Sequence, residues 1–122
     1  MMDTICQAIA KEEGFGIPGG RATRNHNPGD ISWGPFARAH GATALETIPA
    51  GITEPARFAF FPDDATGFAA MKALLDLVYA GQTISQMLYH YAPPSENNTP
   101  LYIANVCDMT GLTPNTVIDQ HL

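Results

Sequence analysis

The chain carries little charge, and most of that charge is negative. Only 15% of its 122 residues are charged, and the formal net charge is −6 at pH 7. Proteins that bind nucleic acid usually present a basic face to the phosphates, and six Lys and Arg residues scattered along the chain do not supply one. The sequence therefore predicts no nucleic-acid partner. The same balance weighs against tight binding to an anionic polymer.

Long hydrophobic runs are also missing. The longest, residues 74–80, is interrupted by Asp76 and is far too short to cross a bilayer. The first residues, Met-Met-Asp-Thr, lack the basic and apolar regions of a secretory signal. We therefore expect that the protein is made in the cytoplasm and does not insert into a membrane. From there the protein acts in place or leaves by another route, unless the chain is a piece of something larger.

Cysteine is scarce, and no Cys-x-x-Cys occurs. Cys6 and Cys107 have apolar neighbours in predicted helices, which favours small buried side chains over a disulfide, although sequence alone leaves both open. The histidines show no ligand spacing, so we expect neither a metal site nor a cofactor. These histidines are His26, His40, His90 and His121.

What the sequence does contain is a set of helix signals at both ends. Residues 4–13 form an expected first helix, capped by Asp3 or Thr4, with Ile5, Ile9 and Glu13 on one i, i+4 row. Gly14 would end it. A helix with an apolar stripe is expected from Ala65 to Gly81. A capping box predicts the start of the next helix, residues 84–90. Two Thr-Pro pairs then predict the starts of a helix over residues 99–111 and of a last short helix.

The segment between these helices is rich in turns. Residues 14–19 match G-x-G-x-x-G, but they follow a helix and contain Pro18, so a nucleotide site is not expected. Asn27-Pro28-Gly29-Asp30 predicts a tight turn. Residues 31–33 and 57–61 are the two expected short strands of a small ribbon. The fold class is therefore mainly α (α+β), a single domain over 1–122 with a small β/loop lobe and a cleft between the lobes.

Glu13 is the strongest candidate for chemistry. The negative end of a helix disfavours a carboxylate, and burial adds to this, so the carboxyl would keep its proton as a general acid must. The i, i+4 row points Glu13 towards the packed side and leaves Glu12 in solvent. The alternative is that both glutamates are solvated at a frayed helix end.

Two sets of polar residues are further candidates beside Glu13. Asn25, Asn27 and Asp30 belong to the turn segment, where Asp30 could be a second carboxylate for glycoside chemistry or simply stabilise the turn. Further along, a Pro-broken loop gathers aromatic and amide side chains that suit sugar rings, or that serve as core-edge residues. These are Tyr91, Glu96, Asn97 and Tyr102.

The order and spacing of several motifs resemble a known family. They are Ile9-Ala10-x-x-Glu13-Gly14-Phe15, Arg24-Asn25-x-Asn27-Pro28-Gly29-Asp30-Ile31, Gly67-Phe68-x-Ala70-Met71, Tyr91-Ala92-Pro93-Pro94-x-Glu96-Asn97 and Tyr102-Ile103. Together they cover nearly the whole chain. They resemble the lysozyme-like domains of phages and bacteria that are related to soluble lytic transglycosylases.

This resemblance implies a helical lysozyme-like fold with an active-site cleft and one catalytic glutamate, Glu13. It implies that Asn27, Tyr91 and Asn97 line a cleft for the glycan strand of peptidoglycan, with cleavage of the β-1,4 bond between N-acetylmuramic acid and N-acetylglucosamine. The expected protein is a monomer that acts at the cell wall or periplasm, or as a virion component. Relatives commonly have Asn where this chain has Asp30.

Two other functions stay open. One is a non-catalytic glycan-binding structural protein of a phage virion or secretion machine, which would keep the fold without needing Glu13. The other is an endo-N-acetylglucosaminidase that acts on a related polymer. The products of cleavage would separate these alternatives from a lytic transglycosylase or muramidase.

Overall fold

The computed structural model describes residues 2–119, and His121 lies outside them. The chain divides into two compact units, a middle unit of residues 13–71 and a terminal unit of residues 1–12 and 72–122. Among the described residues there are six helices and one two-stranded sheet, so the expected α-rich fold class is confirmed at that level. The elements are α1 (Met2–Glu12), α2 (Arg21–Arg24), α3 (Pro35–Ala39), β1 (Ala44–Leu45), β2 (Ala59–Phe60), α4 (Asp64–Leu77), α5 (Ile84–Tyr91) and α6 (Thr99–Thr110).

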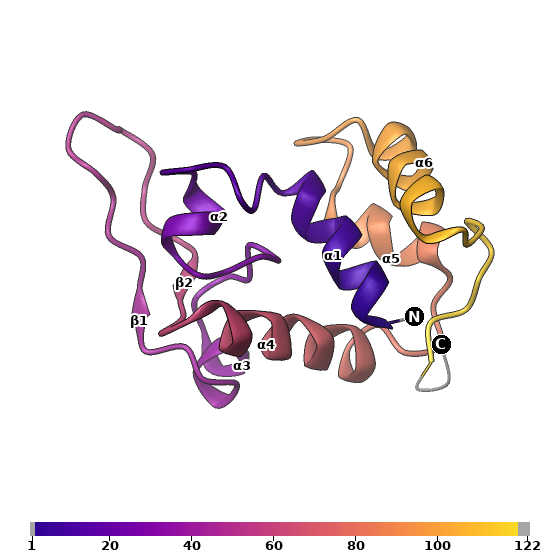
Figure 1. The fold of residues 1–122 in the computed structure, drawn as a ribbon, viewed down its shortest axis with the longest axis horizontal. Helices are drawn as coiled ribbons and strands as arrows, with labels where there is room; N and C mark the ends of the chain where they lie inside the picture. The colour runs from indigo at the N-terminus through magenta and orange to yellow at the C-terminus, as the bar shows by residue number, and fades with distance from the viewer. Residues whose placement is uncertain (1, 120–122) are drawn as a thin grey trace. The chain divides into compact units, whose positions relative to one another are not determined.

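The terminal unit is built around α6, which packs against both α1 and α5 (Figure 1). Ile5 and Ile9 of α1 are fully buried, as their i, i+4 spacing predicts, and Val106 of α6 is buried as well. α1 begins at Met2, so neither Asp3 nor Thr4 is its cap. α4 gives its residues 72–77 to this unit and its earlier residues to the middle unit.

Two sequence signals for helix ends in the terminal unit are confirmed by the structure. Thr83 and Gln86 form the expected capping box. The Thr83 amide donates to the Gln86 side chain at 2.9 Å, and the Gln86 amide donates to the Thr83 hydroxyl oxygen at 3.1 Å. Gly111 ends α6 with a φ of 73°. The Thr99-Pro100 pair that marks the expected start of α6 would make Thr99 its cap, but the cap is Asn98, one residue earlier, because the Asn98 side chain accepts from the amide of Leu101 at 3.2 Å.

The prediction of a last short helix after Thr113-Pro114 is wrong for the described residues. Segment 114–118 instead bonds to segment 81–85, through contacts such as Ile84 N to Thr116 O at 2.9 Å and Ile118 N to Gln82 O at 2.8 Å. Ile118 is fully buried in this arrangement. Pairing with a distant segment and burial of Ile118 therefore override the local helix signal.

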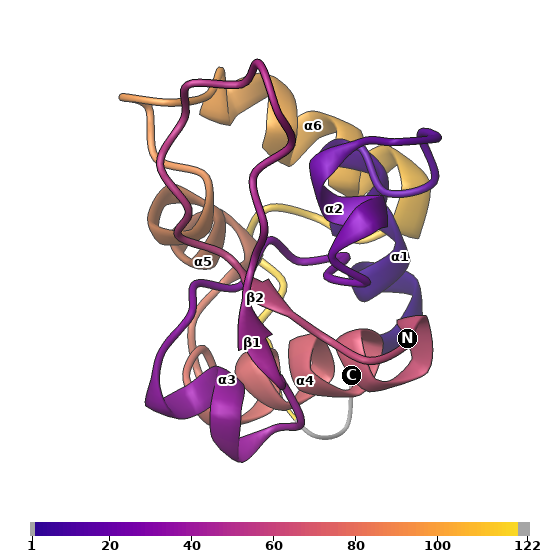
Figure 2. The same ribbon diagram turned by 90° about the vertical axis from the view of Figure 1, so that its left-hand side faces the viewer.

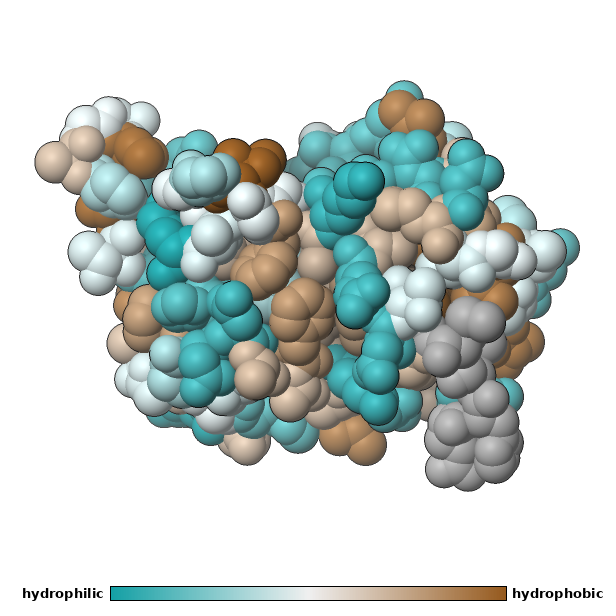
Figure 3. All heavy atoms as spheres, in the orientation of Figure 1, coloured by the Kyte–Doolittle hydropathy of each residue, from teal (hydrophilic) through white to brown (hydrophobic). Residues whose placement is uncertain are grey.

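The middle unit contains the ribbon, and β1 pairs antiparallel with β2 in the register Ala44–Phe60 (Figure 2). The strand expected at 57–61 is confirmed over Ala59–Phe60. The strand expected at 31–33 is wrong, because only Ser32 pairs there, as an isolated bridge to Phe58. Hydrophobic and hydrophilic side chains mix on the exposed segment between the strands, where Ile52 is 45% exposed (Figure 3).

No helix within residues 2–119 combines the length and the apolar character needed to cross a bilayer.

Candidate active site

Glu13 lies on the turn that follows α1. The helix ends at Glu12, one residue earlier than expected, and residues 13–16 form the turn. Gly14 adopts a φ of 80°, the left-handed conformation that glycine reaches without steric cost. Glu13 is partly buried and belongs to the middle unit.

Asp30 closes the second turn of the middle unit. Its amide donates to the carbonyl oxygen of Asn27 at 3.1 Å, and its φ is 48°, an uncommon value for a residue with a side chain. The carboxyl is partly buried. Its Oδ1 atom is buried and has no hydrogen-bond partner among the described residues.

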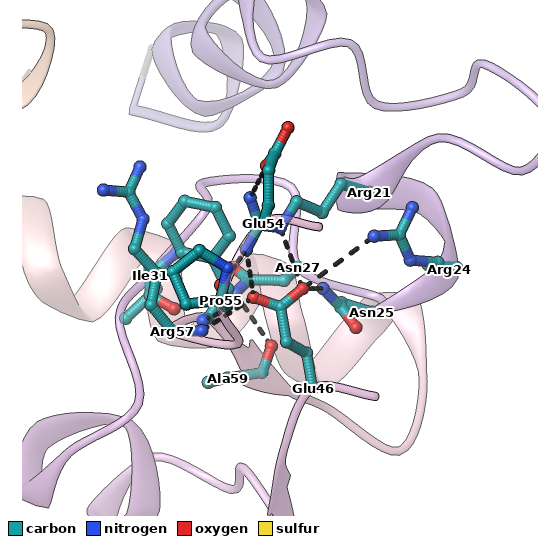
Figure 4. Close-up of polar contacts among 11 residues, drawn as sticks. Arg21, Arg24, Asn25, Asn27, Ile31, Glu46, Glu54, Pro55, Arg57 and Ala59 are labelled. Atoms are coloured by element: carbon teal, nitrogen blue, oxygen red, sulfur yellow. Dashed lines mark hydrogen bonds and ion pairs between the residues drawn. The ribbon is translucent and has the colours of Figure 1, made fainter. Parts of the chain in front are cut away.

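The Asn27 side chain holds this turn in place. It is fully buried, and its amide nitrogen donates to the carbonyl oxygens of Ile31 at 2.9 Å and Ala59 at 3.0 Å (Figure 4). Its Oδ1 accepts from the amide of Ile31 at 2.9 Å. One side chain therefore joins the turn to the residue after it and to β2. The contact of Asn27 with a glycan strand stays a prediction.

Glu13 and Asp30 are hydrogen-bonded to each other through their carboxyl groups. Desolvation, then the charge and hydrogen bond of Glu13, and last the charge of Glu46 raise the pKa of Asp30 to about 8, while Arg21 opposes the shift. Two carboxyl groups in such contact do not both ionise readily. The contact with Glu13 therefore disfavours ionisation of Asp30.

A buried ionic network lies next to this pair, centred on Glu46. The Glu46 side chain accepts from Arg21 at 2.6 and 2.8 Å, and from the amides of Arg57 at 3.0 Å and Phe58 at 2.8 Å (Figure 4). Asn25 also donates to it at 3.1 Å. Burial alone would raise the pKa of Glu46, but these hydrogen bonds outweigh it and lower the pKa to about 2.

Arg21 is shared between two carboxylates. Besides Glu46, it donates to Glu54 at 2.6 Å and to the carbonyl oxygen of Pro55 at 3.1 Å, and its guanidinium lies 4.4 Å from the ring centre of Phe58. Sequence reasoning missed this network. Residues 21–57 contain all four arginines of the chain and two glutamates, Glu46 and Glu54, but this composition does not indicate which side chains pair.

The remaining expected site residues fall into two groups. Asn25 is buried in the middle unit, where its amide is bonded to Glu46. The others belong to the terminal unit: Tyr91 ends α5 with its ring 6.2 Å from that of Tyr79, Glu96 is exposed, Asn97 is partly buried and Tyr102 is buried on α6. Their contact with substrate stays a prediction.

Residues 2–119 contain no group of three His, Cys, Asp or Glu side chains arranged to hold a metal ion. Cys6 is buried and Cys107 partly exposed, and both are free thiols, so no disulfide joins them.

Comparisons with protein-family models, with curated proteins and with solved structures found no match to this chain. The resemblance to lysozyme-like domains therefore rests on the sequence motifs alone. What the site itself offers is a pair of interacting carboxyl groups, one with a raised pKa, next to a carboxyl group whose pKa is lowered.

Proposed function

We propose that the protein is a peptidoglycan-cleaving glycosidase, a lytic transglycosylase or muramidase, with Glu13 as its general acid and base. The observation that carries this is the hydrogen bond between the carboxyl groups of Glu13 and Asp30. A glycosidase needs a carboxyl that is protonated at working pH and lies close to solvent. A partly buried glutamate beside a second carboxyl meets both needs.

The chemistry proceeds in two steps. Glu13 gives its proton to the oxygen of the bond between N-acetylmuramic acid and N-acetylglucosamine. The bond from that oxygen to the muramoyl C1 breaks, and C1 becomes oxocarbenium-like. A hydroxyl then adds to C1 and returns its proton to Glu13. In a muramidase this hydroxyl is water, and in a lytic transglycosylase it is the 6-hydroxyl of the muramoyl residue itself.

Two further features support a glycosidase. Asn27 and the left-handed Asp30 hold the turn beside Glu13 in one geometry, and a rigid acid is worth more to catalysis than a mobile one. The motifs shared with lysozyme-like domains include Glu13 and the Asn-Pro-Gly turn. The cell-wall location, the monomeric state and the sugar contacts of the terminal unit belong to the same proposal.

The test is mass spectrometry of the fragments released from purified peptidoglycan. Wild-type protein should release fragments, whereas Glu13→Gln should release at least about 100-fold less, the usual contribution of a general acid. Glu12→Gln is the matched control, because it removes the neighbouring carboxylate and keeps the helix. Equal activity of Glu13→Gln and wild type would remove Glu13 from the mechanism.

The ends of the products decide between the alternatives. Ends with 1,6-anhydromuramic acid identify a lytic transglycosylase, and reducing muramic acid ends identify a muramidase. Reducing glucosamine ends would identify an endo-N-acetylglucosaminidase instead. Intact peptidoglycan over a range of pH and salt, together with measurable binding, would favour the non-catalytic structural protein.

A further inference from the structure

The backbone of Asp30 is fixed in an uncommon conformation beside Glu13. Its φ of 48° is uncommon for a residue with a side chain and persists where the surrounding structure holds it. Here the surroundings do, through the Asn27 clamp and through Gly67, whose bare backbone lies against His26 and Pro28.

One oxygen of the Asp30 carboxyl has no hydrogen-bond partner in the part of the chain that the structure describes. Oδ1 is buried and has no hydrogen-bond partner within residues 2–119, and the Asp30 carboxyl is hydrogen-bonded to Glu13. A charged carboxylate with a buried, unbonded oxygen is costly, whereas a neutral carboxyl is much less so. The geometry therefore favours a proton on the pair.

The charged groups that face Asp30 come from three segments. They are Glu13 after α1, Arg21 on α2 and Glu46 after β1. Arg21 is the one cation among them, and its guanidinium is already bonded to the carboxylates of Glu46 and Glu54. These two carboxylates neutralise most of the charge of Arg21, so Arg21 does little to stabilise a negative charge on Glu13 or Asp30. This agrees with the raised pKa of Asp30, for which desolvation is the largest cause.

We infer that Asp30 is a positioning residue that shares a single proton with Glu13, so that the two carboxyl groups act as one acid–base unit. Its catalytic meaning rests on the proposed function. In the first step the shared proton leaves through Glu13, and the pair is left with two negative charges. That state is a strong base, which favours return of the proton from the attacking hydroxyl in the second step.

The same geometry argues against Asp30 as a separate nucleophile or water-activating base. Two-carboxylate glycosidases hold those groups about 5–5.5 Å apart when they retain configuration and about 6.5–9.5 Å apart when they invert it. The carboxyl groups of Asp30 and Glu13 are instead hydrogen-bonded to each other, an arrangement that leaves no room for a sugar carbon or a water between them. Asp30 therefore acts through Glu13.

The first experiment needs no activity. The carboxyl ¹³C signals of the full chain are followed by NMR from pH 3 to about 10 in wild type, Asp30→Asn, Glu13→Gln and Glu12→Gln. We expect wild type and Glu12→Gln to keep one proton on the pair above pH 7. Each of the two pair variants should move the titration of the remaining carboxyl down by at least about one pH unit. Independent titration of Glu13 and Asp30 in wild type would overturn the inference.

The second experiment is the pH profile of fragment release from peptidoglycan. Asp30→Asn should lower the alkaline limit of activity by at least about one pH unit, which is a tenfold loss at the wild-type limit. A merely structural role would lower activity equally at every pH. Asp30→Gly, which suits the positive φ, is the second variant if Asp30→Asn folds poorly.

The two proposals fail separately. Coupled titration without any cleavage would sink the proposed function and leave the shared proton standing. Cleavage by wild type with an unchanged alkaline limit in both Asp30 variants would keep the glycosidase and overturn the role of Asp30.

Discussion

Gly67 of α4 lies so close to the carbonyl oxygen of His26 that a Cβ atom at position 67 would collide with it. The same Cβ would lie 2.9 Å from Cδ of Pro28. Both neighbours are parts of the backbone or of a rigid ring, so neither can rotate away. The turn that carries Asp30 thus depends on the absence of a side chain on a helix 37 residues further along the chain.

We expect Gly67→Ala to destabilise the protein by about 1–3 kcal/mol, the usual cost of forcing an extra carbon into a packed site. Urea denaturation followed by circular dichroism measures this. Gly34→Ala is the control, because its Cβ would meet nothing within 4 Å, and it should change stability by no more than about 0.5 kcal/mol. A similar effect of both substitutions would contradict the close approach.

Glu46→Gln should be among the most damaging single substitutions. It removes the charge that Arg21 and two backbone amides bond inside the middle unit, at a cost of about 3–5 kcal/mol. Glu54→Gln removes the other carboxylate of Arg21, but that side chain is 66% exposed, so we expect about 1 kcal/mol or less. Thermal melts of the two variants at pH 7 make the comparison, and equal losses would show that burial of Glu46 does not matter.

The effect of Glu46 should also depend on pH. Its pKa is lowered from 4.5 to about 2 in the folded protein, so ionised Glu46 adds stability above pH 4.5. That stability is lost as the pH falls through about 2. The difference in free energy of unfolding between wild type and Glu46→Gln should therefore shrink across this window in urea titrations. A constant difference would argue against an ionised Glu46.

Asp30 should show the opposite dependence. Its pKa is raised from 3.8 to about 8 on folding, so the contribution of the neutral carboxyl is full below pH 3.8 and is lost as the pH rises through about 8. Between these limits wild type should lose stability relative to Asp30→Asn by more than about 1.4 kcal/mol, the equivalent of one pKa unit. Urea denaturation at several pH values measures it, and parallel curves would contradict the shift.

The two cysteines should differ in reactivity. Burial, with a smaller contribution from Asp3, raises the pKa of Cys6 to about 12, and burial also raises the pKa of the partly exposed Cys107. In the folded protein at pH 8, Ellman's reagent should modify Cys107 first and Cys6 more than about tenfold more slowly. Cys107→Ser should remove the faster phase and Cys6→Ser the slower one. Loss of the faster phase in Cys6→Ser would reverse the assignment.

Sequence reasoning predicted the features that depend on neighbouring residues. The buried Ile5–Ile9 row and the Thr83–Gln86 box follow from helix periodicity and from side chains three residues apart. It failed where partners are distant. The exposed two-residue strand Ala44–Leu45 carries no alternation of its own, and segment 114–118 is fixed by its pairing with residues 81–85.

The candidate site follows the same rule. Glu13 and Asp30 could be singled out from a helix end and a turn motif, but their mutual hydrogen bond could not. Glu46 could not be singled out at all, because its partners lie 25 residues before it and 11 or 12 residues after it. A buried ion pair leaves no local pattern of hydrophobicity, so only the fold reveals it.

The clamp at Asn27 has a chemical consequence as well as a mechanical one. If the amide of Asn27 were hydrolysed to a carboxylate, an oxygen would face the carbonyl oxygens of Ile31 and Ala59 in place of the nitrogen that now donates to them. Asparagine ages in this way when the backbone nitrogen of the next residue attacks its side chain. The next residue here is Pro28, whose backbone nitrogen carries no hydrogen. The proline that shapes the turn therefore also protects its buried amide from spontaneous deamidation.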